Sequence, residues 1–308
     1  MSQEFNVVVL GASGAVGQTM IEILEERNFP VANLFPLASS RSAGETVSFH
    51  GKQVEILDVE SFDWTQAQIG FFSAGGDVSA KWAPIAADAG CVVIDNTSHY
   101  RYDLDIPLVI PEVNPQAIAD FRNRNIIANP NCSTIQMLVA LKPIYDAFGI
   151  SRINVATYQS VSGTGKKAIE ELAGQSAKLL QGLPSEPKVY DKQIAFNVLP
   201  HIDKFMENGY TKEEMKMVWE TQKILGDSEV LVNLPRYGYL CSMAIRKRFI
   251  SRRCSRLMPR KSRRYCGMPK AWCCLKMMMI IQQLSPKVPV ATLCMSAGCA
   301  RIFPTIWV

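Results

Sequence analysis

The sequence has no acidic residue in its last quarter. No Asp or Glu follows Leu234, whereas 15 of the 33 Lys and Arg residues lie there. The part before Leu234 therefore holds 18 basic residues and all 28 acidic ones. The net charge of +5 is thus the sum of an acidic region and a basic one. Seven of the nine cysteines and seven of the thirteen methionines also lie in this last quarter.

A basic, Cys-rich segment is typical of a nucleic-acid-binding tail or a metal module. The cysteines here show no paired C-x-x-C spacing, and no histidine follows His201. We therefore expect no metal site and no nucleic-acid partner.

Long apolar runs are absent as well. No run reaches the roughly 20 residues that a membrane-spanning helix needs. The first residues show no basic n-region of a secretion signal. With 48% hydrophobic and 20% charged residues the composition is globular, and 308 residues suffice for two domains. We expect a cytoplasmic protein with no membrane partner.

The chain begins with the pattern of a dinucleotide site. The β-branched run 6–10 ends in a G-x-x-G-x-x-G turn, and a helical pattern of Val16, Met20, Ile21, Ile23 and Leu24 follows. Gly11 permits a tight turn, Gly14 lets a phosphate approach the backbone, and Gly17 lets the helix pack on the sheet. Such turns also occur without a ligand, but strand, turn and helix together favour cofactor binding. The residues expected to bind it are Gly11, Ala12, Ser13, Gly14, Ala15, Val16 and Gly17.

The second strand, 34–38, ends in Ser39, Ser40 and Arg41. NAD-binding folds usually place an acidic residue here for the ribose 2′-hydroxyl, whereas hydroxyls and an arginine suit a 2′-phosphate. The sequence therefore favours NADP over NAD. A solvated polar turn is the alternative.

Further strand and helix patterns alternate up to residue 130. The strand 69–72 ends in the glycine loop Ser73, Ala74 and Gly75, a type of loop that lines the cofactor crevice of doubly wound sheets. A helix is expected to start at Ser79, a strand at 91–96, an extended segment at 106–114 and a short strand at 126–129. This alternation predicts an α/β, Rossmann-like domain with a mostly parallel, doubly wound sheet.

A small-residue turn around Cys132 precedes an apolar helical pattern. A thiol at a helix N-terminus lies near exposed backbone N–H groups and the positive end of the helix dipole, which lower its pKa and favour the nucleophilic thiolate. A buried structural cysteine is the commoner alternative. The motif alone leaves both open.

The remaining pattern to residue 233 predicts a second unit. A strand at 153–159 leads into a polar glycine loop with Ser162 and Gly163, then a helix at 166–180 that carries Lys167 and Glu170 on its surface. An extended segment follows at 196–201. Thr211 is expected to cap a further helix. On this helix Glu213 and Lys216 would, by spacing alone, form an ordinary surface pair.

Together these stretches resemble the aspartate-β-semialdehyde dehydrogenase family. The pairing of NPNCST with YQSVSGTG is highly specific, and the resemblance runs through about residue 233. The matching stretches are GASGAVG, SSRSAG, FFSAGG, DNTSHYRYDLDIPLVIPEVN, IIANPNCSTIQM, YQSVSGTGKKAIEEL, FNVLPHID and YTKEEMKMVWETQKILGD.

The resemblance implies a reaction in amino-acid biosynthesis from aspartate. NADPH would reduce β-aspartyl phosphate to aspartate semialdehyde with release of phosphate, or the reverse would occur. Cys132 would attack the acyl carbon and hold a thioester, which divides one difficult step into two. Gln159 would position the substrate near that carbon.

The resemblance assigns five further residues. Arg101 and Lys216 would bind phosphate as fixed cations. Glu213 would help to place the substrate, and Ser162 and Gly163 would lie by the nicotinamide. It also implies a homodimer, a dinucleotide-binding domain at 1–130, and an α+β catalytic and dimerisation domain that is only partial at 131–233.

The resemblance stops where the family needs an arginine for the substrate carboxylate and a histidine as general acid and base. These lie in a stretch like VRVPVFYGH, which this chain lacks; Gly238 and Ile245 stand at the matching positions. Yet residues 234–245 can be encoded by DNA that reads PTAVRVPVFYGH once a single C is added in front.

We therefore predict a one-base deletion near the codon for Asn233. Residues 234–308 would then be an out-of-frame tail that cannot pack in place of the family's own strands, and the chain as printed would expose strand edges, fold poorly and have little activity. An evolved basic tail is the alternative. Two other functions stay open: reduction of another acyl phosphate, such as N-acetylglutamyl phosphate, and a dehydrogenase-like protein kept for binding.

Overall fold

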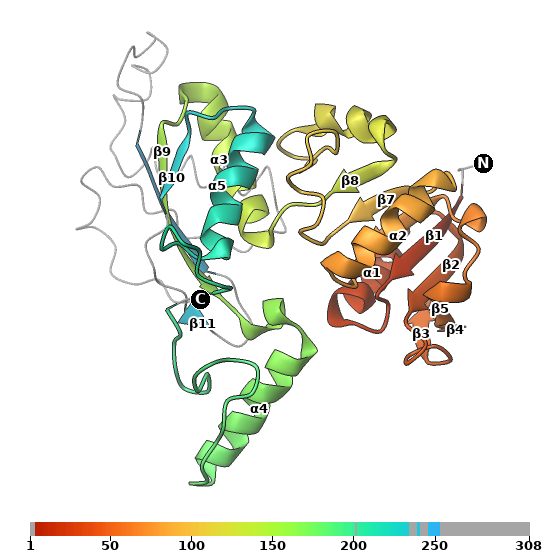
Figure 1. The fold of residues 1–308 in the computed structure, drawn as a ribbon, viewed down its shortest axis with the longest axis horizontal. Coiled ribbons are helices and arrows are strands. Elements are labelled where there is room, and N and C mark those ends of the chain that lie inside the picture. The colour runs from red at the N-terminus through yellow and green to blue at the C-terminus, as the bar shows by residue number, and fades with distance from the viewer. Residues whose placement is uncertain (1–3, 201, 234–238, 241–245, 253–308) are drawn as a thin grey trace. The chain divides into compact units, whose positions relative to one another are not determined.

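The computed structural model describes residues 4–200, 202–233, 239–240 and 246–252 (Figure 1). Contacts between Cα atoms divide the chain into two units. Unit 1 holds Met1–Ile135 and Lys223–Leu225, and unit 2 holds Gln136–Gln222 and the described residues from Gly226 on. The predicted bounds of the two domains, 1–130 and 131–233, stay a prediction.

Unit 1 is built on one six-stranded sheet in which every pairing is parallel. The strand order β5-β2-β1-β6-β7-β8 places β1 near the middle, with the chain winding outward from it in both directions. This is the predicted doubly wound α/β fold. The order reverses between β1 and β6, and ligands of such sheets bind at that point, beyond the carboxyl ends of the strands. The strands are β1 (Phe5–Leu10), β2 (Val31–Ala38), β5 (Leu57–Asp58), β6 (Ile69–Phe72), β7 (Val92–Asp95) and β8 (Ile126–Ala128).

The core of unit 1 encloses β1 on both faces. Successive side chains of a strand point to opposite faces, and Val7, Val8, Val9 and Leu10 are all at most 1% exposed. On one face, Val7 and Val9 belong to the same cluster as Ile21 and Leu24 of α1 (Ala15–Glu26). The burial of consecutive residues explains why β1 is a continuous apolar run.

The helix predicted after the glycine turn is confirmed as α1. Val16 and Ile23 of its apolar pattern are 46% and 40% exposed, so they lie outside the face that packs on the sheet. The helix expected to start at Ser79 is α2 (Gly76–Asp88), which begins three residues earlier. Gly75, with φ of +103°, makes the turn into this helix, and Pro84 lies inside it although proline favours the first turn.

The segment 106–114, expected to be extended, forms no named strand in unit 1; only Leu108 bridges to Ala128. The side chain of Asn114 explains this. Its Oδ1 accepts from Ile110 N at 2.8 Å and its Nδ2 donates to Leu108 O at 2.9 Å, which closes the backbone into a turn. Smaller elements complete the unit: β3 (Thr46–Phe49), β4 (Lys52–Glu55), η1 (Val59–Ser61), η2 (Trp64–Gln66) and η3 (Pro115–Asn123).

Unit 2 has a sheet centred on β9 (Arg152–Gln159). β10 (Leu231–Asn233) and β11 (Tyr239–Leu240) pair with it in parallel, and β12 (Arg246–Arg252) runs antiparallel along residues 152–158 of it. The expected exposed strand edge is therefore wrong for β9 where residues 239–240 and 246–252 pair with it, and the expectation that the tail does not pack in place of the family's strands stays a prediction. Strand pairing uses backbone N–H and C=O groups, which every sequence offers. The rest of the tail lies outside the described residues.

The helices of unit 2 follow the sequence closely. α4 (Lys166–Leu180) has the predicted bounds, with Lys167 and Glu170 exposed, and follows η4 (Val161–Thr164). α5 (Lys212–Leu225) begins with a capping box: Thr211 N donates to Glu214 Oε2 at 2.6 Å, and Glu214 N donates to Thr211 Oγ1 at 3.3 Å. α3 (Cys132–Phe148) crosses the division between the units.

The predicted extended segment 196–201 is wrong where it is described. Phe196 has φ of +55°, which no strand allows, and residues 194–195 donate two backbone N–H bonds to the buried Oε1 of Gln175. That side chain turns the segment before a strand can form. His201 lies outside the described residues.

Replacement by alanine should have opposite effects on the free energy of unfolding at two helical glycines. A Cβ at Gly17 of α1 would lie 2.2 Å from Gly11 O, whereas a Cβ at Gly174 of α4 would meet nothing within 4 Å. Gly17→Ala should lower the free energy of unfolding by about 2–4 kcal/mol because backbone must move. Gly174→Ala should raise it by about 0.5–1 kcal/mol through helix propensity. Urea unfolding followed by circular dichroism measures both, and equal effects would contradict the packing described.

Candidate functional site

The glycine turn of unit 1 lies where β1 ends. Gly11 N and Ala12 N donate to Leu37 O of β2 at 2.8 and 3.1 Å. Gly11 has φ of +93°, and a Cβ there would lie 2.9 Å from Ser73 Oγ and 3.0 Å from Ala74 N. The turn therefore accepts only glycine at this position, and it brings the two predicted cofactor loops together.

The N-terminus of α1 is open toward this turn. Its N-cap is Gly14, no side chain caps it, and its first turn holds no acidic residue. Gly17 allows the helix to approach the backbone of Gly11 closely. An uncapped helix N-terminus with exposed small residues is a site for phosphate groups, so these residues fit a dinucleotide.

The loops after β2 and β6 carry the remaining predicted cofactor residues of unit 1. Ser39, Ser40 and Arg41 are exposed directly after β2, and Arg41 makes no ion pair with any residue that the structure describes. Ser73 N and Oγ both donate to Leu10 O, at 2.9 and 3.1 Å, and Gly75 turns the chain into α2. All these residues lie beyond the carboxyl ends of β2 and β6, the two strands that flank β1.

Three loops prolong the sheet at its carboxyl edge before they leave it. Ser73 N donates to Leu10 O, Asn96 N to Phe72 O, and Asn129 N to Asp95 O, at 2.8–2.9 Å. Asn129 Nδ2 also donates to Asn96 Oδ1 at 2.7 Å, which links the loops after β7 and β8. The start of each functional loop is therefore fixed by the strand beside it.

Cys132 is the first residue of α3. The Oδ1 of Asn131 accepts from Ser133 N at 2.8 Å, and Asn131 O accepts the helical bond from Ile135 N. Asn131 and Ser133 are buried but Cys132 is exposed, so the alternative of a buried structural cysteine is wrong for it. Cys91 is the contrast: burial raises the pKa of its thiol to about 12.

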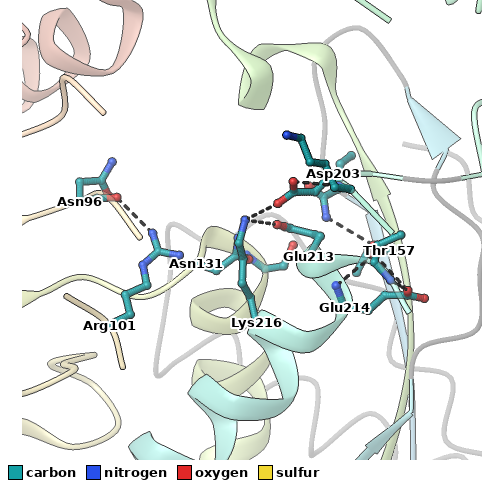
Figure 2. Close-up of polar contacts among 12 residues, drawn as sticks. Asn96, Arg101, Asn131, Thr157, Asp203, Glu213, Glu214 and Lys216 are labelled. Atoms are coloured by element: carbon teal, nitrogen blue, oxygen red, sulfur yellow. Dashed lines mark hydrogen bonds and ion pairs between the residues drawn. The ribbon is translucent and has the colours of Figure 1, made fainter. Parts of the chain in front are cut away.

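Arg101 lies in the loop after β7, and a buried carboxylate shapes that loop. Asp95, which is fully buried, accepts from Ser79 Oγ and Thr97 Oγ1 at 2.8 Å and from Thr97 N at 3.1 Å. Arg101 is 7% exposed, and its Nη2 donates to Asn96 O at 3.1 Å (Figure 2). The guanidinium is thus held by the loop that it belongs to.

Lys223, near the end of α5, fixes the same loop from its other side. Its Nζ donates to the carbonyl oxygens of Arg101, Asp103 and Ile106 at 3.0, 2.6 and 2.9 Å. Burial lowers the pKa of Lys223, although the charges of Asp103 and Asp105 partly oppose this. Three carbonyl acceptors use all three donors of an ammonium group, so Lys223 serves the backbone that carries Arg101.

The predicted residues of unit 2 form two groups. Gln159 ends β9 and is 8% exposed, with its Nε2 3.5 Å from Thr157 Oγ1. Ser162 and Gly163 lie just beyond it in η4 and are exposed, and Ser162 Oγ contacts Ser160 Oγ. Glu213 and Lys216 form the other group on α5.

Lys216 is held between two carboxylates. Its Nζ lies 2.8 Å from Asp203 Oδ2 and 3.2 Å from Glu213 Oε2 (Figure 2). The side chains of Lys216 and Glu213 are only 13% and 12% exposed, so the expectation of an ordinary surface pair is wrong. Burial alone would lower the pKa of Lys216, but the hydrogen bond that it donates to Asp203 and the charges of both carboxylates raise it.

Sequence reasoning missed Asp95, Lys223 and Asp203. Asp95 had a usable signal, because it ends a buried strand next to hydroxyl residues. Lys223 and Asp203 had none, since their partners are distant in sequence or depend on loop conformation. No group of three described His, Cys, Asp or Glu residues is placed to hold a metal ion. Among the helices of the described residues, none is long and apolar enough to cross a membrane.

Comparison with known proteins accounts for the first three quarters of the chain. Residues 6–121 match the family described as "Semialdehyde dehydrogenase, NAD binding domain", and residues 141–243 match "Semialdehyde dehydrogenase, dimerisation domain". The first match agrees with the prediction that this part of the chain is a dinucleotide-binding domain.

Individual relatives agree with these matches. An aspartate-semialdehyde dehydrogenase of Shewanella sp. (strain DB6705) is 87% identical over 233 residues, which are 76% of this chain and 69% of the relative. Aspartate-semialdehyde dehydrogenase 2 of Vibrio cholerae is 71% identical over the same length. A crystal structure of aspartate semialdehyde dehydrogenase II from Vibrio cholerae, complexed with ASA, superposes with a TM-score of 0.79 at 67% identity and covers 80% of this chain and 73% of that one.

The contrast between the two described cysteines predicts selective alkylation. Near neutral pH, iodoacetamide should modify Cys132 at least about 100-fold faster than Cys91, because Cys91 is buried and stays protonated until the pH approaches about 12. Mass spectrometry of tryptic peptides resolves the two sites. Similar rates at both cysteines would contradict the exposed position at the start of α3.

Proposed function

The chain belongs to the aspartate-semialdehyde dehydrogenase family, and on that premise we propose that its residues serve the NADP-dependent interconversion of β-aspartyl phosphate and aspartate semialdehyde. One observation supports this most directly. Cys132, Arg101 and the glycine turn all follow carboxyl ends of strands in the same parallel sheet. Nucleophile, phosphate-binding cation and cofactor turn thus share one edge of unit 1.

The cofactor is held by backbone more than by side chains. Gly11–Gly17 and the open N-terminus of α1 receive the pyrophosphate, and Arg41 with Ser39 and Ser40 receives the 2′-phosphate. Ser162 and Gly163 take the nicotinamide end. Bound NADP supplies or accepts the two electrons of the reaction.

The covalent step belongs to Cys132. Its thiolate attacks the acyl carbon of β-aspartyl phosphate, the bond from that carbon to the phosphate oxygen breaks, and phosphate leaves with the electron pair. The thioester remains on sulfur, and in the reverse direction phosphate attacks it. The start of α3 favours the thiolate through its dipole, and Gln159 orients the acyl group.

Charged groups bind the two ends of the substrate. Arg101 and Lys216 bind phosphate, because guanidinium and ammonium groups donate to its oxygens and balance its charge. Glu213, which pairs with Lys216, helps to place the substrate. We also propose a homodimer formed through the matched dimerisation domain.

We propose that a chain of this sequence has low dehydrogenase activity. The family arginine for the substrate carboxylate and the family histidine are absent, and the positions Gly238 and Ile245 lie outside the described residues. Without a general acid and base, proton transfer during thioester chemistry loses about 100- to 10,000-fold in rate.

Restoring the reading frame should restore turnover. A gene with one base inserted after the codon for Asn233 should encode an enzyme at least about 1,000-fold faster than the printed chain. The assay is phosphate-dependent formation of NADPH from NADP and aspartate semialdehyde. Cys132→Ser in the restored enzyme is the control and should remove the activity. Near-normal turnover by the printed chain would contradict the proposal.

Arg41 should discriminate between the two nicotinamide cofactors. Arg41→Ala should weaken NADP binding about tenfold, the effect of losing a charge-assisted hydrogen bond, and leave NAD binding unchanged. Titration calorimetry of the full chain measures both without requiring turnover. Arg27→Ala, at the opposite end of α1, is the matched control. Equal weakening of both cofactors would show that Arg41 does not contact the 2′-phosphate.

A further inference from the structure

Asp203 is held in an unusual backbone conformation beside Lys216. Its φ is +66°, a left-handed value that costs most side chains about 1 kcal/mol. Its two carboxylate oxygens are both engaged: Oδ1 accepts from Lys204 N at 2.9 Å, and Oδ2 accepts from Lys216 Nζ at 2.8 Å (Figure 2). The loop therefore presents a carboxylate directly to the ammonium group.

The ammonium group of Lys216 lies beside more negative charge than it can balance. One positive charge faces the carboxylates of Asp203 and Glu213, at 2.8 and 3.2 Å. Burial would raise the pKa of Asp203, but the hydrogen bonds from Lys216 and Lys204 and the charges of Lys216 and Lys212 lower it overall. Asp203 is therefore ionised near neutral pH and repels any anion that approaches Lys216.

We infer that Asp203 competes with phosphate for the ammonium group of Lys216 and so limits the affinity of this site for the anion. The inference rests on the proposed role of Lys216 as a phosphate-binding residue. Phosphate needs the donors and the charge that Asp203 occupies.

The two carboxylates differ in their freedom to release Lys216. Glu213 lies on α5, one turn from Lys216 and 12% exposed, so the helix fixes it there. Asp203 lies on a loop, is 30% exposed, and makes the shorter contact. A rotation of its side chain toward solvent frees one donor of Lys216 while Glu213 stays in place.

The test is the affinity of the full chain for inorganic phosphate. Asp203→Asn keeps the size of the side chain, suits a left-handed backbone, and removes the charge. It should lower the dissociation constant for phosphate about three- to tenfold, the range expected when one partly buried like-charge repulsion is removed. Phosphorus NMR line widths, titrated at constant pH and ionic strength, measure this without any turnover.

Two further variants make the result decisive. The phosphate binding that remains in Lys216→Met measures binding at other sites, including the 15 basic residues after Leu234. This background is subtracted from the binding measured for the other variants. Asp203→Gly also accepts φ of +66° and removes the carboxylate, so it should act in the same direction and serves if Asp203→Asn misfolds.

The outcomes separate the inference from the proposed function. Tighter binding in the Asp203 variants, absent when Lys216→Met is added, supports it. Unchanged or weaker binding in the Asp203 variants, with loss of binding in Lys216→Met, overturns the role of Asp203 and leaves Lys216 as the phosphate ligand. Unchanged binding in Lys216→Met overturns both.

Discussion

Unit 1 depends on hydrogen bonds that continue its parallel sheet one residue past β6, β7 and β8. Leu10, Phe72 and Asp95 each end a strand, and the carbonyl of each accepts the N–H of a residue that begins a neighbouring loop. Because these carbonyls are satisfied, the loops leave the sheet at defined points and in a fixed direction. The glycine turn, the Arg101 loop and the turn before Cys132 all inherit their positions from this edge.

Two helix N-termini at that edge are prepared for different tasks. α1 begins with a glycine cap and small exposed residues, so its backbone N–H groups can face a bulky anion. α3 begins with the side chain of Asn131 bonded to Ser133 N, and the exposed first residue is Cys132. In the proposed function, one helix end leaves its donors for a phosphate group, and the other uses a side-chain cap and directs its dipole at a sulfur atom. On that proposal, the same element of structure serves binding in one place and reactivity in the other.

The sequence predicted what depends on local pattern. Apolar runs located β1, β2, β6, β7 and β8 but not β3, β4 or β5, glycine spacing located the turn after β1, and Thr211 located the start of α5. It failed where a side chain redirects the backbone from a distance, as Asn114 and Gln175 do for the segments expected to be extended. It also could not find Asp203 or Lys223, whose roles arise from three-dimensional contacts with no periodic signature. The burial of the Glu213–Lys216 pair was hidden for the same reason, since spacing along a helix says nothing about what covers it.

The antiparallel pairing of β12 with β9 bears on how this chain behaves in a crowded solution. β12 has the sequence RKRFISR, and no other described strand pairs with its outer side. The backbone N–H and C=O groups on the outer side of a border strand are the groups to which a strand of another chain can pair. Within the described residues, the segment therefore closes one side of β9 and moves the border at which a second chain could add from β9 to β12.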